Sequence, residues 1–472
     1  MTATSIKARL AILVFISTAL RRSLERIMRI YCQFQPYSMI FNFVALSALF
    51  FSQFALSNNQ FSDRLSTYEN DSATPSVNNM NNTKLANNQI SPFEISITDA
   101  DIIDLKMRLD NTRIPDQLNN IAWEYGTDLS LMNDLLAYWR DEFDWRAQEE
   151  MLNQFDQFTT EVESLKLHFI HERSSNPDAI PLMIVHGWPG SISEFSKIIG
   201  PLTDPLNHGG DISDSFHIVA PSLPGFGFSE IPSEPGYSPE RIAVILAELM
   251  QKLGYERYAI AGGDWGAIIN RHLANHFPER LIGLHSNMIL ASPPSDAEQR
   301  ANVSETEASA QSDRRAYMLN EVAYQQIQGT KPQTLGYGLA DSPSGLAAWI
   351  VEKFHGWTDM PQDNTGDLAN HFTYDELLTN ISIYWFTNTI TSSTRIYFEN
   401  RNAEQIKPME FINVPTGAAV FPAEIFITPR AWAESSYDLR HWTVMEEGGH
   451  FAALEKPRLY LEDLRAFFRL LR

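Results

Sequence analysis

One short stretch decides the fold of this chain: residues 258–269 read Tyr-Ala-Ile-Ala-Gly-Gly-Asp-Trp-Gly-Ala-Ile-Ile. A short apolar strand runs into a glycine pair, a single carboxylate, Trp265, a third glycine and then a helical pattern. Small residues on both sides of a central residue let strand and helix approach closely across a strained turn. This is the form of a nucleophile elbow, with Asp264 at the position where esterases and lipases carry serine. Because Gly-Gly-Asp can also be an ordinary turn, the rest of the chain has to decide.

Strand and helix patterns alternate around this stretch. The apolar run at 180–185 is followed by a turn-rich loop, His186-Gly187-Trp188-Pro189-Gly190-Ser191, and buried parallel strands have this appearance. In an open α/β sheet, ligands bind at the carboxyl ends of such strands. Strands are expected at residues 165–171, 180–185, 216–221, 258–261 and 281–287, with a helix at 242–253. The alternation predicts a doubly wound, mostly parallel sheet.

The strand pattern stops after residue 290. Helical stretches then follow, strands resume, and a helix closes the chain; the helices are expected at 346–354, 374–386 and 458–469, and the strands at 414–421 and 442–445. We interpret residues 291–390 as a helical cap over the ends of the strands. The core sheet is therefore expected in two parts, at 165–290 and 391–472.

Helical spacing also precedes the sheet. Ile102, Leu105 and Leu109 recur at helical intervals, and the segment 132–139 has the same pattern. Residues 92–164 are therefore expected to form a helical amino-terminal extension.

The first residues differ from the rest in composition. Residues 1–57 carry basic residues and two apolar runs, and the second run ends in Ala55-Leu56-Ser57, which resembles a cleavage site. We interpret this tail as a signal peptide or a membrane anchor, unless the true start is Met28 or Met39. It predicts export or membrane attachment. Residues 58–91, rich in Asn and Ser, are expected to be a linker.

The overall composition excludes some classes of function. Lys and Arg number 36 against 58 Asp and Glu, which gives a formal charge of −22. With no basic patch to neutralise phosphates, a nucleic-acid partner is not expected. The only cysteine, Cys32, lies in the tail, so the chain can form neither an intramolecular disulfide nor a cysteine-based metal cluster.

An aspartate nucleophile needs a base to activate water and an acid to orient that base. His450 follows the last expected strand in a Gly-Gly-His-Phe loop and is the candidate base. Glu424 follows the penultimate strand and is the candidate acid; Glu446 and Glu447 are rivals but lie close to His450 in sequence. The order Asp264, Glu424, His450 is that of an α/β-hydrolase fold.

Two backbone N–H groups are expected to form the oxyanion hole. One belongs to Trp265, the residue after the nucleophile. The other comes from the loop after the early strand, where Trp188 is the best candidate because Pro189 has no N–H.

The identity of the nucleophile restricts the reaction. A carboxylate that attacks a carbonyl would form an anhydride, so Asp264 suits a saturated carbon, where it forms an alkyl ester that water can cleave. Epoxides and haloalkanes both fit. An epoxide oxygen needs O–H donors such as tyrosines, whereas a halide needs N–H donors. Neither reaction needs a metal or a cofactor.

From about residue 92 to the carboxyl terminus, the chain resembles the microsomal-type epoxide hydrolases. The matching motifs are Thr112-Arg113-Ile114-Pro115, His186-Gly187-Trp188-Pro189-Gly190-Ser191-Ile192-Ser193-Glu194-Phe195, Asp341-Ser342-Pro343-Ser344-Gly345-Leu346-Ala347-Ala348-Trp349 and Gly448-Gly449-His450-Phe451-Ala452-Ala453. The resemblance implies two cap tyrosines that hold the epoxide oxygen, and the matching positions are Tyr324 and Tyr397. It also implies the family's amino-terminal segment ahead of the α/β core.

The expected function is hydrolysis of a small lipophilic epoxide by water to a vicinal diol. A haloalkane dehalogenase, which shares an aspartate elbow followed by Trp, is the first alternative. A non-catalytic α/β-hydrolase relative that keeps the pocket as a receptor is the second.

Overall fold

A computed structural model of the protein describes residues 89–360, 367–403 and 410–472. The expected tail at 1–57 and the linker up to residue 88 lie outside the described residues. Within the described ranges, no helix has the length and apolar character needed to cross a membrane.

The described residues form one nine-stranded sheet in the order β1-β2-β3-β5-β4-β6-β7-β8-β9. The strands are β1 Ser91–Pro92, β2 Gln157–Val162, β3 Leu165–Glu172, β4 Ile180–Val185, β5 Phe216–Pro221, β6 Tyr258–Gly262, β7 Leu281–Ser286, β8 Ile412–Val420 and β9 Tyr437–Val444. The pairs from β5 to β9 are parallel, and those from β1 to β5 are antiparallel. The predicted doubly wound α/β-hydrolase sheet is confirmed, with an antiparallel edge.

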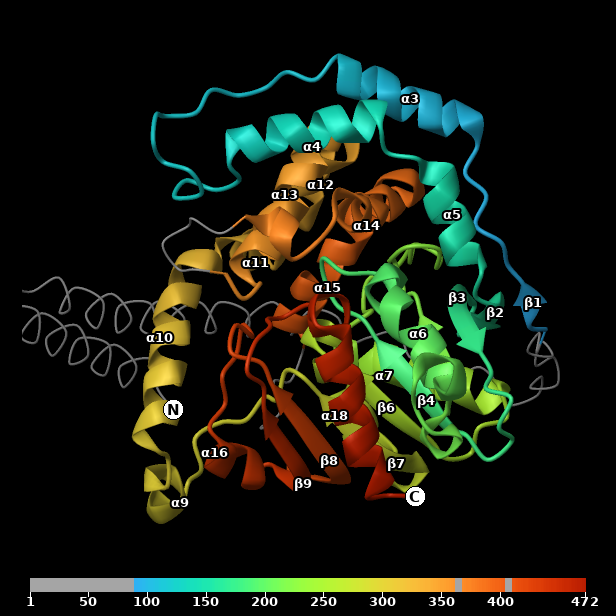
Figure 1. Ribbon diagram of the computed structural model, residues 1–472, viewed down its shortest axis with the longest axis vertical. Helices are drawn as coiled ribbons and strands as arrows, with labels where there is room; N and C mark the ends of the chain where they lie inside the picture. The colour runs from blue at the N-terminus through green and yellow to red at the C-terminus, as the bar shows by residue number, and fades with distance from the viewer. Residues whose placement is uncertain (1–88, 361–366, 404–409) are drawn as a thin grey trace, which may run out of the picture. The chain divides into compact units, whose positions relative to one another are not determined.

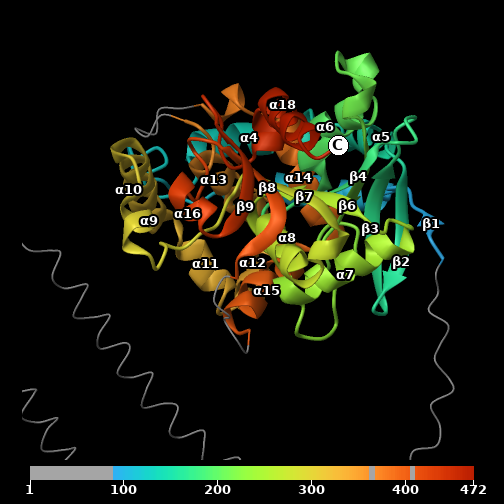
Figure 2. The same ribbon diagram turned by 90° about the horizontal axis from the view of Figure 1, so that it is seen from below.

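Helices cover both faces of this sheet (Figures 1 and 2). They are α6 Ser196–Thr203, α7 Pro239–Lys252, α8 Asp264–His276, α16 Arg430–Glu434, α17 Ala452–Glu455 and α18 Pro457–Arg469. Alternate side chains of a strand point to opposite faces. In β6, Tyr258 and Ile260 therefore join the core under α7 and α8, while Ala259 and Ala261 join the core under α6 and α18.

Among the described residues between β7 and β8, seven helices make up the cap. They are α9 Ala297–Ala301, α10 Glu305–Glu321, α11 Ala323–Gln328, α12 Pro332–Asp341, α13 Pro343–Gly356, α14 Tyr374–Thr387 and α15 Ile390–Arg401. The helix predicted at 346–354 is the central part of α13, and the one predicted at 374–386 is nearly the whole of α14. Helix α15 continues the helical segment past residue 390, where we expected the core to resume. Its Ser- and Thr-rich sequence hides the helical period.

The helical part of the amino-terminal extension packs on the cap. Its helices are α3 Asp99–Asp110, α4 Leu129–Asp141 and α5 Trp145–Asn153. The indole N–H of buried Trp139 in α4 donates to Ser382 Oγ of α14 at 3.1 Å. Figure 1 shows α3 and α4 lying above the cap helices. The extension then ends in β2, which we did not predict because its polar residues obscure the strand pattern.

Candidate active site

The turn between β6 and α8 holds Asp264 in a strained conformation. Its φ is +48°, in the left-handed region that residues with a side chain rarely adopt. The turn is also crowded, because a Cβ on Gly262 or Gly266 would collide with the carbonyl oxygen of Val185 in β4. The side chain of Asp264 is thereby presented at the carboxyl end of the sheet, as a nucleophile elbow requires.

The loop after β4 contacts this carboxylate directly. The backbone N–H of Trp188 donates to Asp264 Oδ1 at 2.8 Å. Gly187 permits the approach, since a Cβ there would collide with the aspartate side chain. Cap helix α14 anchors the same loop: Asn380 Nδ2 donates to the Pro189 carbonyl at 2.7 Å and the Tyr384 hydroxyl to the Gly190 carbonyl at 2.6 Å.

Trp265, the other expected oxyanion donor, is the second residue of α8. The first N–H groups of a helix have no acceptor within the helix. The backbone N–H of Trp265 is one of these first N–H groups, because α8 begins at Asp264.

The imidazole of His450 lies between two carboxylates. Its Nε2 is 3.4 Å from Asp264 Oδ2, and its Nδ1 is 2.5 Å from Glu424 Oε1. The backbone N–H of His450 donates to the Trp357 carbonyl of the cap at 2.8 Å. Asp264, Glu424 and His450 therefore meet as the sequence predicts, whereas the rivals Glu446 and Glu447 are exposed.

The charges around His450 govern its protonation. Burial lowers the pKa of the imidazole, but the charge of Glu424 and the hydrogen bond and charge of Asp264 outweigh burial and raise the pKa to about 10. The imidazole is consequently protonated in the resting site at neutral pH. Part of this effect depends on Asp264 being ionised.

Both cap tyrosines lie over the indole rings beside the nucleophile. Tyr324 in α11 stacks on Trp188 with ring centroids 5.3 Å apart, and Tyr397 in α15 meets Trp265 edge-on at 4.7 Å. The two phenol rings are 5.7 Å apart. Burial raises the pKa of both hydroxyls, so they remain protonated donors. The Tyr397 hydroxyl is buried and interacts with Tyr324 and Trp265.

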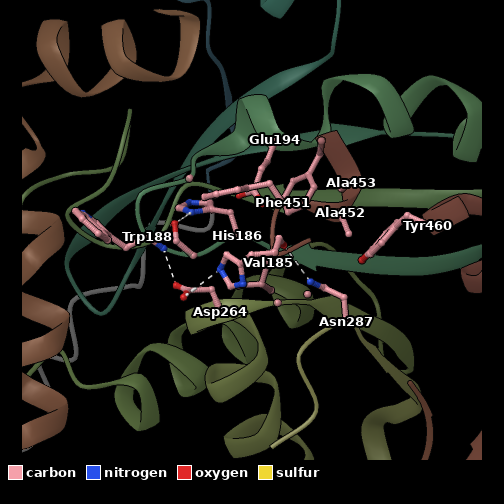
Figure 3. A pocket seen from close by; sticks show the side chains of 16 residues that line it. Val185, His186, Trp188, Glu194, Asp264, Asn287, Phe451, Ala452, Ala453 and Tyr460 are labelled. Carbon is pink, nitrogen blue, oxygen red and sulfur yellow. Dashed lines mark hydrogen bonds and ion pairs between the residues drawn. The ribbon is translucent and has the colours of Figure 1, made fainter. Parts of the chain in front are cut away.

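A small cavity lies on the other side of Asp264 (Figure 3). Its volume of about 20 Å³ is enough for one water molecule, and its lining includes Asp264, His450, Asn287 and Glu194. Glu194 lies in the short 3₁₀ helix Ile192–Phe195. Burial raises the pKa of its carboxyl group to about 8, so at neutral pH it is largely a neutral acid.

Three residues near the triad were missed by the sequence analysis. Glu194 belongs to the motif at residues 186–195, but only the structure shows that its side chain lines the cavity beside Asp264. Asn287 directly follows β7, a position that could have identified it; its Nδ2 donates to Glu424 Oε2 at 3.1 Å and to the His450 carbonyl at 3.2 Å. Arg314 of α10 donates to the Glu424 and Ala423 carbonyls at 2.9 and 2.7 Å, and nothing in the sequence signals this contact.

Comparison with known proteins identifies the family of this chain. A family model described as the epoxide hydrolase N terminus matches residues 90–195, and the model of the alpha/beta hydrolase fold matches residues 180–316. Epoxide hydrolase 1 of Sus scrofa is 39% identical over 81% of this chain and 89% of its own length. The chain belongs to the epoxide hydrolase family. The enzyme is a hydrolase that acts on the ether bond of epoxides.

Solved structures of the family extend the match to the whole described fold. The juvenile hormone epoxide hydrolase of Bombyx mori has a TM-score of 0.76 at 33% identity and covers 82% of this chain and 96% of its own. The epoxide hydrolase of Aspergillus niger has a TM-score of 0.71 at 31% identity and covers 82% of this chain and 98% of its own. Paired phenols above a carboxylate also favour an epoxide over the haloalkane alternative.

Proposed function

We propose that the enzyme opens lipophilic epoxides with Asp264 as the covalent nucleophile. The hydroxyls of Tyr324 and Tyr397 donate hydrogen bonds to the ring oxygen. The Asp264 carboxylate attacks a ring carbon, the carbon–oxygen bond breaks, and the freed alkoxide takes a proton from a phenol. The product of this step is a hydroxyalkyl ester of Asp264. The observation that carries this proposal is the carboxylate held between the Trp188 N–H and His450 beneath two buried phenols.

In the second step, water cleaves the ester. Once Asp264 is esterified, it loses its charge, and with it one of the causes that raise the pKa of His450. The imidazolium then gives up its proton, which restores the phenol that protonated the alkoxide. Neutral His450, oriented by Glu424, takes a proton from the water that attacks the ester carbonyl. The N–H groups of Trp188 and Trp265 stabilise the tetrahedral oxyanion. When it collapses, the leaving alkoxide takes the proton from His450 to complete the diol, and the Asp264 carboxyl group then returns its own proton to His450, which restores the resting carboxylate and imidazolium.

Glu194 and the cavity beside it are suited to hold the attacking water. The cavity has room for one molecule and borders both His450 and the carbonyl carbon that must be attacked. A neutral carboxyl group can both donate to and accept from that water. We assign Glu194 as the residue that positions the water for His450.

Aromatic side chains indicate a bulky apolar substrate. The site beside Asp264 is walled by rings that offer few polar partners, namely those of Trp188, Trp265, Tyr324, Trp357 and Tyr397. Burial of an apolar group against such rings is favourable, whereas polar substituents would lose their hydration. A panel of styrene oxide, stilbene oxide and long-chain lipid epoxides tests this substrate class.

A single turnover in water labelled with ¹⁸O, with enzyme in excess, tests the covalent route. The ester mechanism transfers the label first to the Asp264 side chain, because water attacks the ester carbonyl. Label found in the Asp264 peptide supports the proposal. Label that enters the diol directly, and never the enzyme, contradicts it.

For the amino-terminal tail, we infer export or membrane attachment from its basic and apolar pattern. Amino-terminal sequencing of the mature protein and extraction of membranes with carbonate distinguish a cleaved signal peptide, an anchor and a later start. A soluble cellular protein that begins at Met1 would contradict this inference.

A further inference from the structure

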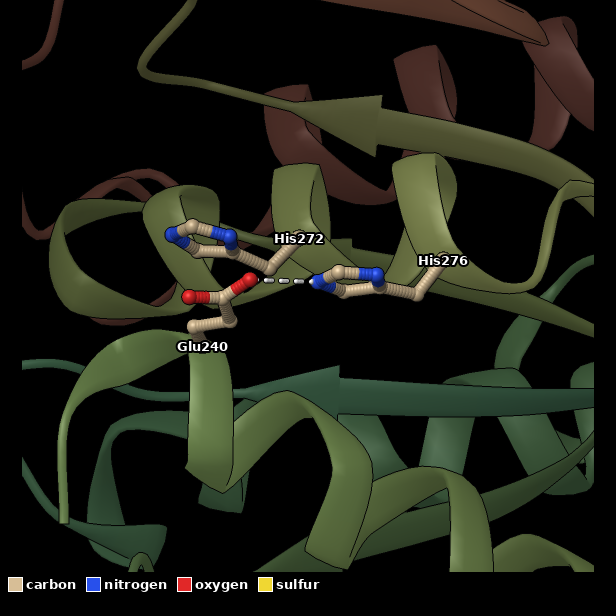
Figure 4. Close-up of side chains that lie close together, drawn as sticks. All are labelled: Glu240, His272 and His276. Atoms are coloured by element: carbon tan, nitrogen blue, oxygen red, sulfur yellow. Dashed lines mark hydrogen bonds and ion pairs between the residues drawn. The ribbon is translucent and has the colours of Figure 1, made fainter. Parts of the chain in front are cut away.

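A second group of polar side chains lies where α7 and α8 meet, away from the catalytic carboxylates. Glu240 lies in the first turn of α7, and His272 and His276 lie one helical turn apart on the same face of α8. Figure 4 shows Glu240 facing the two imidazoles. Their potential ligand atoms, one from each residue, all lie within 4.8 Å of one another.

The separations are close to those that a bound metal ion would impose. Zinc binds imidazole nitrogen and carboxylate oxygen at about 2.0–2.2 Å, so neighbouring ligands in a tetrahedral site lie about 3.3 Å apart. His276 Nε2 and Glu240 Oε1 are already 3.0 Å apart. The His272 and His276 rings are nearly parallel, with an interplanar angle of 12°. Small side-chain rotations would bring the three ligand atoms around one ion.

The position of the cluster also suits an ion arriving from solution. His276 and Glu240 expose 36% and 45% of their side chains. Two histidines and one acid leave the fourth position of a tetrahedral ion to water. The mixed nitrogen and oxygen ligand set favours zinc and similar divalent transition metals over magnesium or calcium, which prefer oxygen alone.

We propose that Glu240, His272 and His276 form a three-ligand site for a divalent transition metal of the zinc class, which clamps α7 to α8. Asp264 begins α8 and His276 ends it, so the two lie about 18 Å apart along the helix. The ion would take no part in the reaction. It would stabilise the packing of the helix whose first residue is the nucleophile.

Zinc titration of the full-length, untagged protein tests the site after removal of bound metals with a chelator. We expect one zinc ion per chain and a melting temperature that rises by a few degrees at a zinc concentration about 100 times the dissociation constant. His272→Gln, His276→Gln and Glu240→Gln should each weaken binding about tenfold or more. His208→Gln, which alters an exposed histidine elsewhere, is the matched control and should bind as the parent does.

Cobalt provides an independent readout, because a tetrahedral cobalt complex absorbs visible light far more strongly than a hydrated ion. That absorption should appear in the parent and in His208→Gln and be lost in the three ligand variants. Epoxide turnover measured without metal should be the same in all of them. Zinc affinity that survives loss of both histidines, or a melting temperature that zinc does not raise, overturns the proposal.

Discussion

The backbone N–H of Trp188 donates to Oδ1 of Asp264 at 2.8 Å, although 76 residues separate the two in sequence. In the proposed mechanism, one carboxylate oxygen is therefore already in the oxyanion position before any substrate binds. The other oxygen, Oδ2, is the one near the imidazole of His450. In the proposed mechanism, the resting site thus already holds the carbonyl oxygen of the future ester beside its stabilising donor, and little reorganisation is needed between the two steps.

Replacement of His450 by Gln should separate the two steps. Ring opening requires only Asp264 and the phenols, whereas ester cleavage requires the base. We expect the variant to accumulate the Asp264 ester, seen as a mass increase on the peptide that contains Asp264 after incubation with epoxide. His208→Gln serves as the control and should not accumulate it. A His450→Gln protein that never gains this mass argues against a covalent intermediate.

Removal of one phenol should slow ring opening. Tyr397→Phe keeps the ring that packs on Trp265 and deletes only the hydroxyl, so ring opening should fall on the order of 10²-fold or less, as for loss of a single oxyanion donor. Rapid mixing of excess enzyme with a styrene oxide measures the step. Tyr337→Phe, at an exposed cap tyrosine, is the control. An unchanged rate in Tyr397→Phe would remove that residue from the mechanism.

Glu194→Gln tests the water-positioning role. The amide keeps the size of the carboxyl group, but its NH₂ group can only donate, so one of the two oxygens that face the water is lost as an acceptor and ester cleavage should slow by on the order of 10²-fold at most. Formation of the ester should be unaffected, because Glu194 lies behind the nucleophile. Single-turnover measurement of both steps separates these effects, with the exposed Glu298→Gln as control. If both steps slow equally, Glu194 supports the fold of the site and does not position water.

The pKa of His450 predicts a pH dependence. In the resting enzyme it is raised to about 10, and esterification removes the contribution of the Asp264 charge. The pKa in the ester should therefore lie below about 10, and cleavage should accelerate with rising pH until the imidazole is neutral. Single-turnover rates of ester cleavage from about pH 6 to about pH 10 measure this pH dependence. A cleavage rate that falls as pH rises over this range would contradict His450 as the base.

A buried carboxylate should control stability in acid. Asp463 of α18 accepts from His285 of β7 and His441 of β9, each at 2.8 Å. Burial opposes its ionisation, but these hydrogen bonds outweigh burial and hold the pKa of Asp463 well below its usual range. Its contribution to stability is therefore present above the unfolded pKa near 3.9 and is lost as pH falls towards the folded pKa.

Asp463→Asn should consequently lower the free energy of unfolding by about 3 kcal/mol at neutral pH, since one partner of a buried cluster is removed. Its stability should also depend less on pH in acid. Melting temperatures over a pH series provide the measurement, and Asp178→Asn, at an exposed aspartate, provides the control. Parallel pH profiles for the parent and Asp463→Asn would refute the assignment.

The sequence predicted those parts of the site that depend on the pattern of a short stretch of chain. The elbow at Asp264 consists of a strand, glycines and a helix within twelve residues, and strand ends indicated where His450 and Glu424 belong. The tyrosines could not be derived in this way. Tyr324 and Tyr397 were identified by family resemblance, because neither helix has a pattern that distinguishes a catalytic phenol from a packing one.

The sequence by itself determined where strands and helices alternate around Asp264 and which residues are the candidates for the triad, because apolar periodicity and glycine spacing act over a few residues. Only the tertiary structure decided what surrounds them. The cavity at Glu194, the support of Glu424 by Arg314 and the meeting of Glu240 with His272 and His276 all join separate elements. Such contacts depend on how helices pack in three dimensions, and no local spacing in the chain records that packing.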